Sequence, residues 1–272
     1  MSIRGLIDES VIALLRLGLF DRVVGYLSFQ RRRKTRRQVE ARLVVEGRYP
    51  DIVQSGAFAG MRLPSKAAFM DARFEKTFGA YEHELFPLVA ELGQTSAAFD
   101  TLVNVGAADG FYTVGLARLF PEAKILAFEP NARKTPVLLE MASLNGIDGR
   151  IQLSGACTPE ILADLAPTGS VLVVVDVDGY EKPLLDPHVV PWLVAATLLV
   201  ETHDCFVPGI TELLKKRFLE THDIQEIAMS GPDYATIPAL KGLTMHQLDA
   251  MVGSERPALQ SWLWMRPKVT AV

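Results

Sequence analysis

The stretch Val103-Asn-Val-Gly-Ala-Ala-Asp-Gly-Phe-Tyr112 decides the fold class of this chain of 272 residues. It begins as a short apolar strand, passes through glycine and other small residues, and enters a helical pattern that stops at Pro121. Glycine and alanine allow a ligand to come close to the main chain. A strand, loop and helix of this kind are typical of open α/β sheets, which bind ligands at the carboxyl ends of their strands.

Strands and helices alternate after this stretch. The near-continuous apolar runs are typical of strands that are buried on both faces of a parallel sheet. The expected strands are 101–105, 125–128, 171–177, 198–200, 224–229 and 260–265. The expected helices are 71–92 with an interruption at Pro87, 111–120, 135–144 with Thr135 as N-cap, 210–218 and 244–252. This alternation predicts a doubly wound, Rossmann-like α/β sheet.

The N-terminal part of the chain has a different pattern. Residues 3–46 carry apolar residues at helical spacing, and residues 31–37 hold six positive charges in seven positions. One interpretation is a helical cap on the catalytic domain with solvated charges; the other is a helix that attaches a cofactor-binding scaffold to a membrane surface or a partner. We expect a helical extension over 1–76 and the main domain over 77–272. The segment 230–258, rich in Gly and Pro, is a candidate substrate lid.

The composition excludes several classes of protein. Apolar residues make up 49% and charged residues 22%, which excludes a disordered chain. The formal net charge is −4, whereas a nucleic-acid-binding protein usually has a basic surplus, so no nucleic-acid partner is expected. Cys157 and Cys205 form no Cys-x-x-Cys pair and are too few for a disulfide framework, which favours a reduced, cytoplasmic setting. The apolar stretch 11–20 is too short to span a bilayer.

Glu129 indicates the type of cofactor. It follows the second apolar run and lies 23 residues beyond Gly106, where a carboxylate can accept hydrogen bonds from both ribose hydroxyls. A dinucleotide loop requires Gly-x-Gly-x-x-Gly, but here the order is Gly106-x-Ala108-x-Gly110. Asp109 would in addition repel a diphosphate. A sulfonium cofactor is therefore favoured over a nicotinamide dinucleotide, and a dehydrogenase is the least favoured activity.

Five stretches carry a resemblance to a known family. They are 79–84 (GAYEHE), 103–112, 128–131 (FEPN), 175–181 (VDVDGYE) and the weaker 199–203 (LVETH). Over residues 77–270 the chain resembles class I S-adenosylmethionine-dependent methyltransferases of the FkbM type. Asn104 stands where class I enzymes often carry an acid, and Asp178 replaces the usual Glu. The resemblance implies a seven-stranded, mostly parallel sheet and transfer of a methyl group to a hydroxyl of a sugar, polyketide or other small metabolite.

The same stretches supply the candidate cofactor residues. The residues expected to bind S-adenosylmethionine are Tyr81, Glu82, Asn104, Gly106, Ala107, Asp109, Phe111, Tyr112, Glu129, Pro130, Asn131, Ala156, Asp176 and Asp178. Tyr81 and Glu82 would close over the methionine part of the cofactor or pack at a helix start. Asp178 has an alternative role in orienting the turn at Gly179. The expected partner is a small hydroxyl substrate, and a homodimer is one option for the assembly.

Asp176, Glu201 and His203 are the candidate catalytic residues. They lie at the ends of two apolar strands, and the carboxyl ends of neighbouring parallel strands meet at one edge of a sheet. Asp176 or His203 could act as a general base for the substrate hydroxyl. Alternatively, Asp176, Glu201 and His203 hold a divalent cation that lowers the pKa of the hydroxyl.

Overall fold

A computed structural model describes residues 19–65, 70–94, 99–230, 234, 237–251 and 260–268, with only the backbone for residues 19–23. The chain forms two compact units: residues 1–50 with 234–254, and residues 51–233 with 255–272. The first part of the expected N-terminal helix, 3–18, lies outside the described residues, as do several residues of the candidate lid. The lid and the domain boundary at residue 76 therefore stay predictions.

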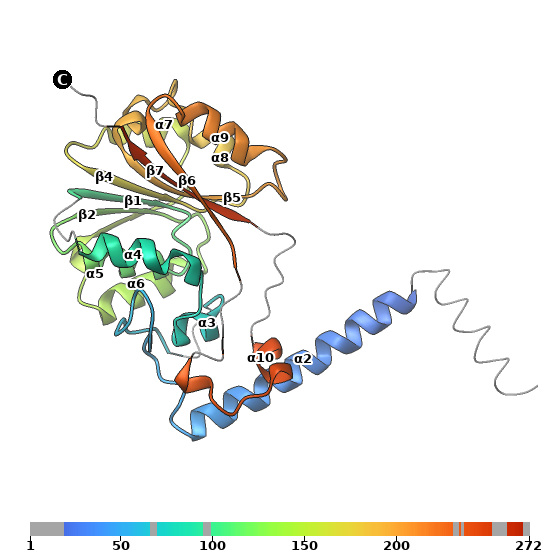
Figure 1. The fold of residues 1–272 in the computed structure, drawn as a ribbon. Coiled ribbons are helices and arrows are strands. Elements are labelled where there is room, and N and C mark those ends of the chain that lie inside the picture. The colour runs from blue at the N-terminus through green and yellow to red at the C-terminus, as the bar shows by residue number, and fades with distance from the viewer. Residues whose placement is uncertain are drawn as a thin grey trace, which may run out of the picture. The chain divides into compact units, whose positions relative to one another are not determined.

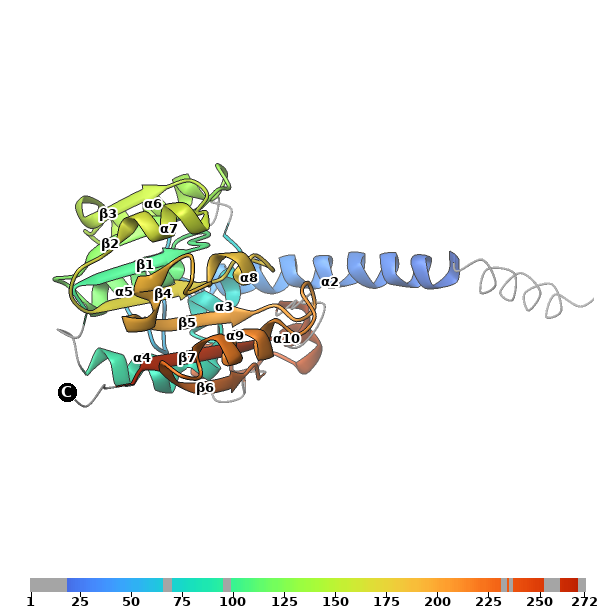
Figure 2. The same cartoon turned by 90° about the horizontal axis from the view of Figure 1, so that it is seen from above.

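The second unit contains a seven-stranded sheet with the order β3-β2-β1-β4-β5-β7-β6 (Figures 1 and 2). Its strands are β1 (Thr101–Val105), β2 (Lys124–Phe128), β3 (Ile151–Ser154), β4 (Val171–Val175), β5 (Thr197–Thr202), β6 (His222–Ala228) and β7 (Ser261–Pro267). The first five pair in parallel, and β7 is antiparallel to β5 and to β6. The predicted fold class, a Rossmann-like, doubly wound and mostly parallel sheet, is confirmed.

Helices cover both faces of this sheet (Figure 1). One face carries α4 (Phe86–Gly93), α5 (Phe111–Leu119) and α6 (Thr135–Leu144), and the other carries α7 (Pro159–Leu165), α8 (Glu181–Leu184) and α9 (Ile210–Phe218). Successive side chains of a strand point to opposite faces. In β1, Leu102 accordingly packs in the core beside α5, whereas Val103 packs in the core beside α9. The apolar runs of the central strands β1, β2, β4 and β5 are therefore buried on both sides, whereas the residues of the edge strand β6 are mostly half-buried or exposed.

The helix expected over residues 71–92 is in fact two helices, α3 (Arg73–Phe78) and α4. The chain leaves α3 through a left-handed conformation at Gly79, with φ 66°. A Cβ at Gly79 would overlap the carbonyl oxygen of Ser55, so glycine is required there. Pro87 does not break a helix but lies in the first turn of α4, where a missing backbone N–H leaves no hydrogen bond unmade.

Two further predictions need correction. Thr135 is the first residue of α6 rather than its N-cap, and Lys134 at the cap position makes no side-chain cap hydrogen bond. Strand β3 was not predicted because it lies at the edge of the sheet, and its residues are half-buried and exposed in turn. Such a strand lacks the continuous apolar run that marks the central strands.

The first unit contains α2 (Leu19–Val45) and α10 (Met245–Met251). Val39 and Leu43 of α2 are buried, and α2 contacts α10. Thr244 and Gln247 form a reciprocal capping pair at the start of α10, each side chain accepting a hydrogen bond from the other residue's N–H. None of the described helices is both long and apolar enough to cross a membrane.

Candidate active site

The loop after β1 is fixed by contacts with its own domain. Gly106 has φ 83°, and a Cβ there would overlap the carbonyl oxygen of Asp176 on the neighbouring chain segment. Gly110 has φ 89°, and a Cβ there would lie 2.7 Å from Cγ of Leu138 in α6. Both glycines therefore let the main chain pack closely against the protein itself. The sequence had suggested close approach of a ligand as the reason for these glycines.

Glu129 follows β2, and its side chain contacts the loop after β1. Its Oε2 accepts a hydrogen bond from the N–H of Ala108 at 2.7 Å, and its Oε1 accepts one from the N–H of Asn131 at 2.7 Å. The side chain is only 8% exposed. A carboxylate offers about four acceptor positions, so about two are left for a ligand. The carboxylate is thus held in a fixed orientation at the carboxyl end of the sheet.

A pocket with an empty volume of about 330 Å³ lies beside the loop. Its lining includes eight of the predicted cofactor residues: Tyr81, Asn104, Gly106, Ala107, Asp109, Phe111, Tyr112 and Asp176. Asn104, where an acid was the family expectation, donates from Nδ2 to the hydroxyl of Thr113 at 2.8 Å. Six predicted cofactor residues do not line this pocket. Glu82 and Glu129 are buried, whereas Pro130, Asn131, Ala156 and Asp178 are exposed positions after β2, β3 and β4.

Lys76 of α3 also lines the pocket, although it was not among the residues predicted from the sequence. Its Nζ lies 2.6 Å from Oδ2 of Asp109, with both side chains less than 5% exposed. Because this ammonium compensates the charge of Asp109, the argument that Asp109 would repel a diphosphate does not hold. The spacing of Gly106, Ala108 and Gly110 still departs from a dinucleotide loop. No local pattern around Lys76 marks it in the sequence, because its partner is 33 residues away in the chain.

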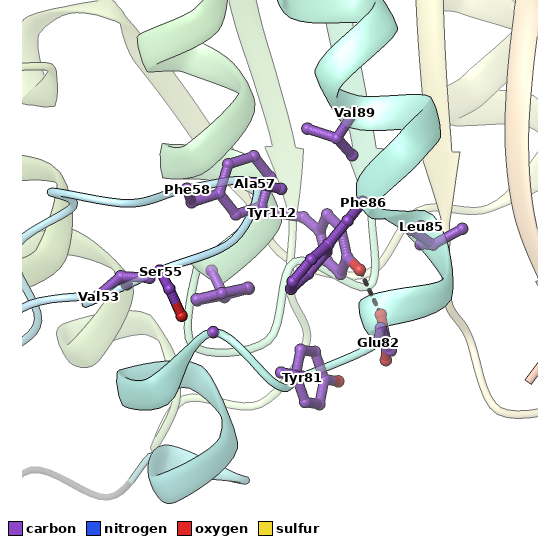
Figure 3. A pocket seen from close by; sticks show the side chains of 12 residues that line it. Val53, Ser55, Ala57, Phe58, Tyr81, Glu82, Leu85, Phe86, Val89 and Tyr112 are labelled. Atoms are coloured by element: carbon purple, nitrogen blue, oxygen red, sulfur yellow. Dashed lines mark hydrogen bonds between the residues drawn. The ribbon is translucent and has the colours of Figure 1, made fainter. Parts of the chain in front are cut away.

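Tyr81, Phe111 and Tyr112 line both this pocket and a second one. The hydroxyl of Tyr112 donates a hydrogen bond to Oε2 of Glu82, which is buried in a left-handed conformation with φ 47° (Figure 3). Burial and the charge of Glu82 hold the pKa of Tyr112 well above its usual value, so the phenol remains a donor. The second pocket is lined mainly by apolar side chains, among them Phe58, Leu85 and Val89 (Figure 3).

His203 lies at the centre of a cluster of carboxylates at the ends of β4 and β5. Its Nε2 is 3.6 Å from Asp176, 3.5 Å from Asp178 and 3.8 Å from Glu201. Its Nδ1 lies 2.5 Å from Oε1 of Glu181, the first residue of α8, and both side chains are at most 1% exposed. The predicted approach of the two strand ends is confirmed. The partner of the imidazole, Glu181, was not among the residues predicted for the site.

The carboxylates of this cluster change the protonation of its members. Burial raises the pKa of Asp176 to about 6, and the charges of Glu82 and Asp178 act in the same direction. Burial alone would lower the pKa of His203, but the hydrogen bond with Glu181 and the charge of Asp176 outweigh it, and the pKa is raised. The imidazole therefore favours its protonated form, whereas Asp176 is a more basic carboxylate than an ordinary aspartate.

Three ligand atoms of this cluster could converge on one metal ion. Atoms of Asp176, Asp178 and His203 all lie within 4.8 Å of one another. The metal set expected from the sequence contained Glu201 in place of Asp178, but among the described residues Glu201 lies outside this group. Asp178 follows the end of β4 in a left-handed conformation, φ 48°, which strand periodicity does not predict.

The sequence matches no model of a known protein family, and no curated protein matches it either. Solved structures are similar in fold. The O-methyltransferase TomG from Streptomyces achromogenes, in complex with SAM, is 13% identical over 67% of this chain and 80% of that chain, with a TM-score of 0.44. A putative O-methyltransferase from Klebsiella pneumoniae is 15% identical over 75% of this chain and 84% of that chain, with a TM-score of 0.44. An rRNA methylase from Streptococcus thermophilus is 12% identical over 69% of this chain and 98% of that chain, with a TM-score of 0.47. Similarity at this level identifies no reaction.

Proposed function

We propose that this chain is an S-adenosylmethionine-dependent O-methyltransferase of the FkbM type that acts on a hydroxyl of a small metabolite. The observation that carries the proposal is the position of Glu129, whose carboxylate is oriented by two backbone amides beside the loop at Gly106. That arrangement suits the two ribose hydroxyls of an adenosyl group.

The proposed reaction needs a base more than an activator of the methyl group. The substrate oxygen attacks the methyl carbon, the carbon–sulfur bond breaks with its electron pair going to sulfur, and the hydroxyl proton passes to a base. Asp176 is the better base of the two candidates, because His203 favours its protonated form. A base whose pKa lies near the working pH transfers protons efficiently, and the pKa of Asp176 is about 6. Glu201 and His203 would position Asp176 from the neighbouring strand.

Calorimetric titration with S-adenosylhomocysteine tests the cofactor assignment without knowledge of the substrate. We expect a dissociation constant in the micromolar range or below, and no binding of NAD. Absence of S-adenosylhomocysteine binding by the folded chain would contradict the proposal. The alternative in which the domain is a scaffold that binds the cofactor without catalysis predicts the same heat but no methyl transfer to any hydroxyl substrate in a screen.

A metal-assisted form of this reaction is a second candidate, favoured by the orientation of His203. Glu181 holds Nδ1, so Nε2 can face an ion as it does in metal sites where a carboxylate orients the imidazole. Asp176, Asp178 and His203 would hold the ion, and two carboxylates with one imidazole suit Mn²⁺, Fe²⁺ or Zn²⁺ better than Mg²⁺. A bound cation would lower the pKa of the substrate hydroxyl.

Titration of the EDTA-treated chain with Mn²⁺ tests this candidate. We expect binding that is lost in Asp178→Asn, which removes one of the three ligands. Asp223→Asn, at an exposed position on β6, is the matched control and should bind as the wild type does. Equal binding by Asp178→Asn, or no binding by the wild type, would contradict the metal-assisted form and leave Asp176 acting alone.

A further inference from the structure

Lys76 is a buried cation at the edge of the cofactor pocket. Its ammonium lies 2.6 Å from Asp109, and the rings of Tyr81 and Phe111 lie 4.7 and 5.3 Å from its Nζ. An ion pair taken out of water loses much of its hydration and often stabilises a fold no better than apolar side chains of the same size would. A fully buried pair that lines a pocket therefore calls for a role beyond stability.

The hydrogen-bonding capacity of Lys76 exceeds what Asp109 uses. An ammonium has three N–H donors, and Asp109 accepts one of them. The other oxygen of Asp109 accepts a hydrogen bond from the N–H of Phe111 at 3.3 Å, so the carboxylate itself is anchored to the start of α5. Lys76 is also the only lysine or arginine among the described residues that line this pocket. The pocket thus offers one fixed cation with unused donors.

We propose that Lys76 binds the carboxylate of the methionine part of S-adenosylmethionine, with Asp109 holding the ammonium in position. This inference rests on the proposed function. The cofactor carries two positive groups, the sulfonium and the α-ammonium, and one negative group, the carboxylate. Asp176 on the same pocket suits a positive group, and Lys76 provides the complement for the negative one. Lys76 would then contribute to selection of the complete amino-acid cofactor over its fragments.

The test compares S-adenosylhomocysteine with its decarboxylated analogue, which keeps the adenosyl group, the sulfur and the amine. We expect the wild type to bind S-adenosylhomocysteine about 10- to 100-fold more tightly, as is typical for loss of one charge-assisted hydrogen bond. Lys76→Gln should remove this preference and leave the affinity for the decarboxylated analogue within about threefold. Lys216→Gln, at an exposed position on α9, is the matched control.

Lys76→Gln leaves the carboxylate of Asp109 buried without its partner, so the double variant Lys76→Gln/Asp109→Asn, which removes both charges, accompanies it. Equal affinity of the wild type for the two ligands would overturn the assignment, as would a variant that weakens both ligands equally. Failure of the wild type to bind either ligand would instead contradict the proposed function, so the two failures are distinguishable. Where Lys76→Gln does not fold, the double variant, which buries no unpaired charge, carries the comparison of the two ligands.

A second inference rests on α2 and is independent of the cofactor pocket. Val24, Tyr26, Leu27 and Phe29 are 44 to 61% exposed in the first part of this helix. The basic run Arg31–Arg37 follows at once, and most of its side chains are exposed. A cluster of Lys and Arg on an exposed helix is attracted to the headgroups of an anionic membrane, and exposed aromatic and aliphatic residues beside it add apolar contact with the lipid. We propose that α2 binds such a lipid surface.

Flotation of the full chain with vesicles tests this second proposal. We expect binding to phosphatidylcholine vesicles that contain about one third phosphatidylglycerol, loss of binding near 0.5 M salt, and little binding to pure phosphatidylcholine. Replacing Arg31, Arg32 and Arg33 by Gln, or Leu27 and Phe29 by Ser, should weaken binding at least tenfold. Absence of flotation at low salt would overturn the proposal, and a dimer that does not float would assign this surface to a second copy of the chain.

Discussion

Replacing Glu129 by alanine tests the structural feature on which the proposed function depends. In the unliganded domain each oxygen of this carboxylate accepts one hydrogen bond of 2.7 Å, from Ala108 and from Asn131. About two of its four acceptor positions remain for the ribose hydroxyls. The side chain is 8% exposed, so water competes little for these positions. The change to alanine removes the hydrogen bonds to the ribose hydroxyls and, at the same time, the acceptor for the amides of Ala108 and Asn131.

The magnitude follows from these contacts. A hydrogen bond to a charged acceptor contributes about 1.5–3 kcal/mol, so loss of two such bonds corresponds to about 3–6 kcal/mol. Since about 1.4 kcal/mol is a factor of ten, even the lower value predicts a dissociation constant for S-adenosylhomocysteine raised by roughly 100-fold. Solvation of the freed amides of Ala108 and Asn131 by water should leave the fold intact, because both lie in loops, where Ala108 is only half-buried and Asn131 is exposed.

Isothermal titration calorimetry measures the change, with denaturant unfolding of each variant as a check on folding. Glu220→Ala, at an exposed position after α9, is the matched control and should bind as the wild type does. An affinity of Glu129→Ala within about threefold of the wild type, with the fold intact, would refute the assignment of Glu129 to the ribose. The geometry of Glu129 and the loop would then no longer support an adenosyl cofactor.

Three further predictions concern the fold around the site. Gly106→Ala should lower the unfolding free energy by more than about 2 kcal/mol in urea titration, because the Cβ would overlap the Asp176 carbonyl, whereas Gly149→Ala, with open space around it, should change it little. Burial lowers the pKa of His222, so its neutral form is favoured in the fold and the unfolding free energy falls as the pH drops below about 6.5. The loss of unfolding free energy on acidification should be larger for the wild type than for His222→Gln, and equal losses would contradict this. Burial raises the pKa of Cys157 to about 12, so in a Cys205→Ser variant, which removes the half-buried second thiol, Ellman's reagent should label Cys157 only after unfolding; labelling of the native variant would count against that burial.

Much of the fold could be predicted from the sequence because the central strands are buried on both faces. Strand β1 has the predicted ends, since its five residues are all buried and a loop of glycine, alanine and aspartate follows. Strand β3 could not be found in the same way, because an edge strand with exposed positions has no continuous apolar run. Gly79 and Pro87 show the limit of local rules. The helix was expected to be interrupted at Pro87, but it ends at Gly79, where the close approach of Ser55 requires glycine.

The candidate site was predictable where the topology of the sheet determines it. Asp176 and His203 lie at the carboxyl ends of adjacent parallel strands, so their approach follows from the strand order. Lys76 and Glu181 could not be predicted, because their roles depend on partners 33 and 22 residues away on other elements. Lys76 also neutralises Asp109, which the sequence alone presented as an uncompensated charge that would repel a diphosphate. A charged residue in a loop can be interpreted only once its neighbours in space are known.

The charges around His203 connect the two candidate mechanisms. Asp176, Asp178, Glu181 and Glu201 surround one imidazole, so the cluster carries more negative than positive charge even when His203 is protonated. Such an excess in a partly buried site favours a positively charged ligand, either a sulfonium or a divalent ion. In the proposed reaction the sulfonium loses its charge as the methyl group leaves, and Asp176 loses its own by accepting the proton. The total charge of site and ligands is then unchanged, which keeps the electrostatic cost of the step low where solvent cannot compensate for it.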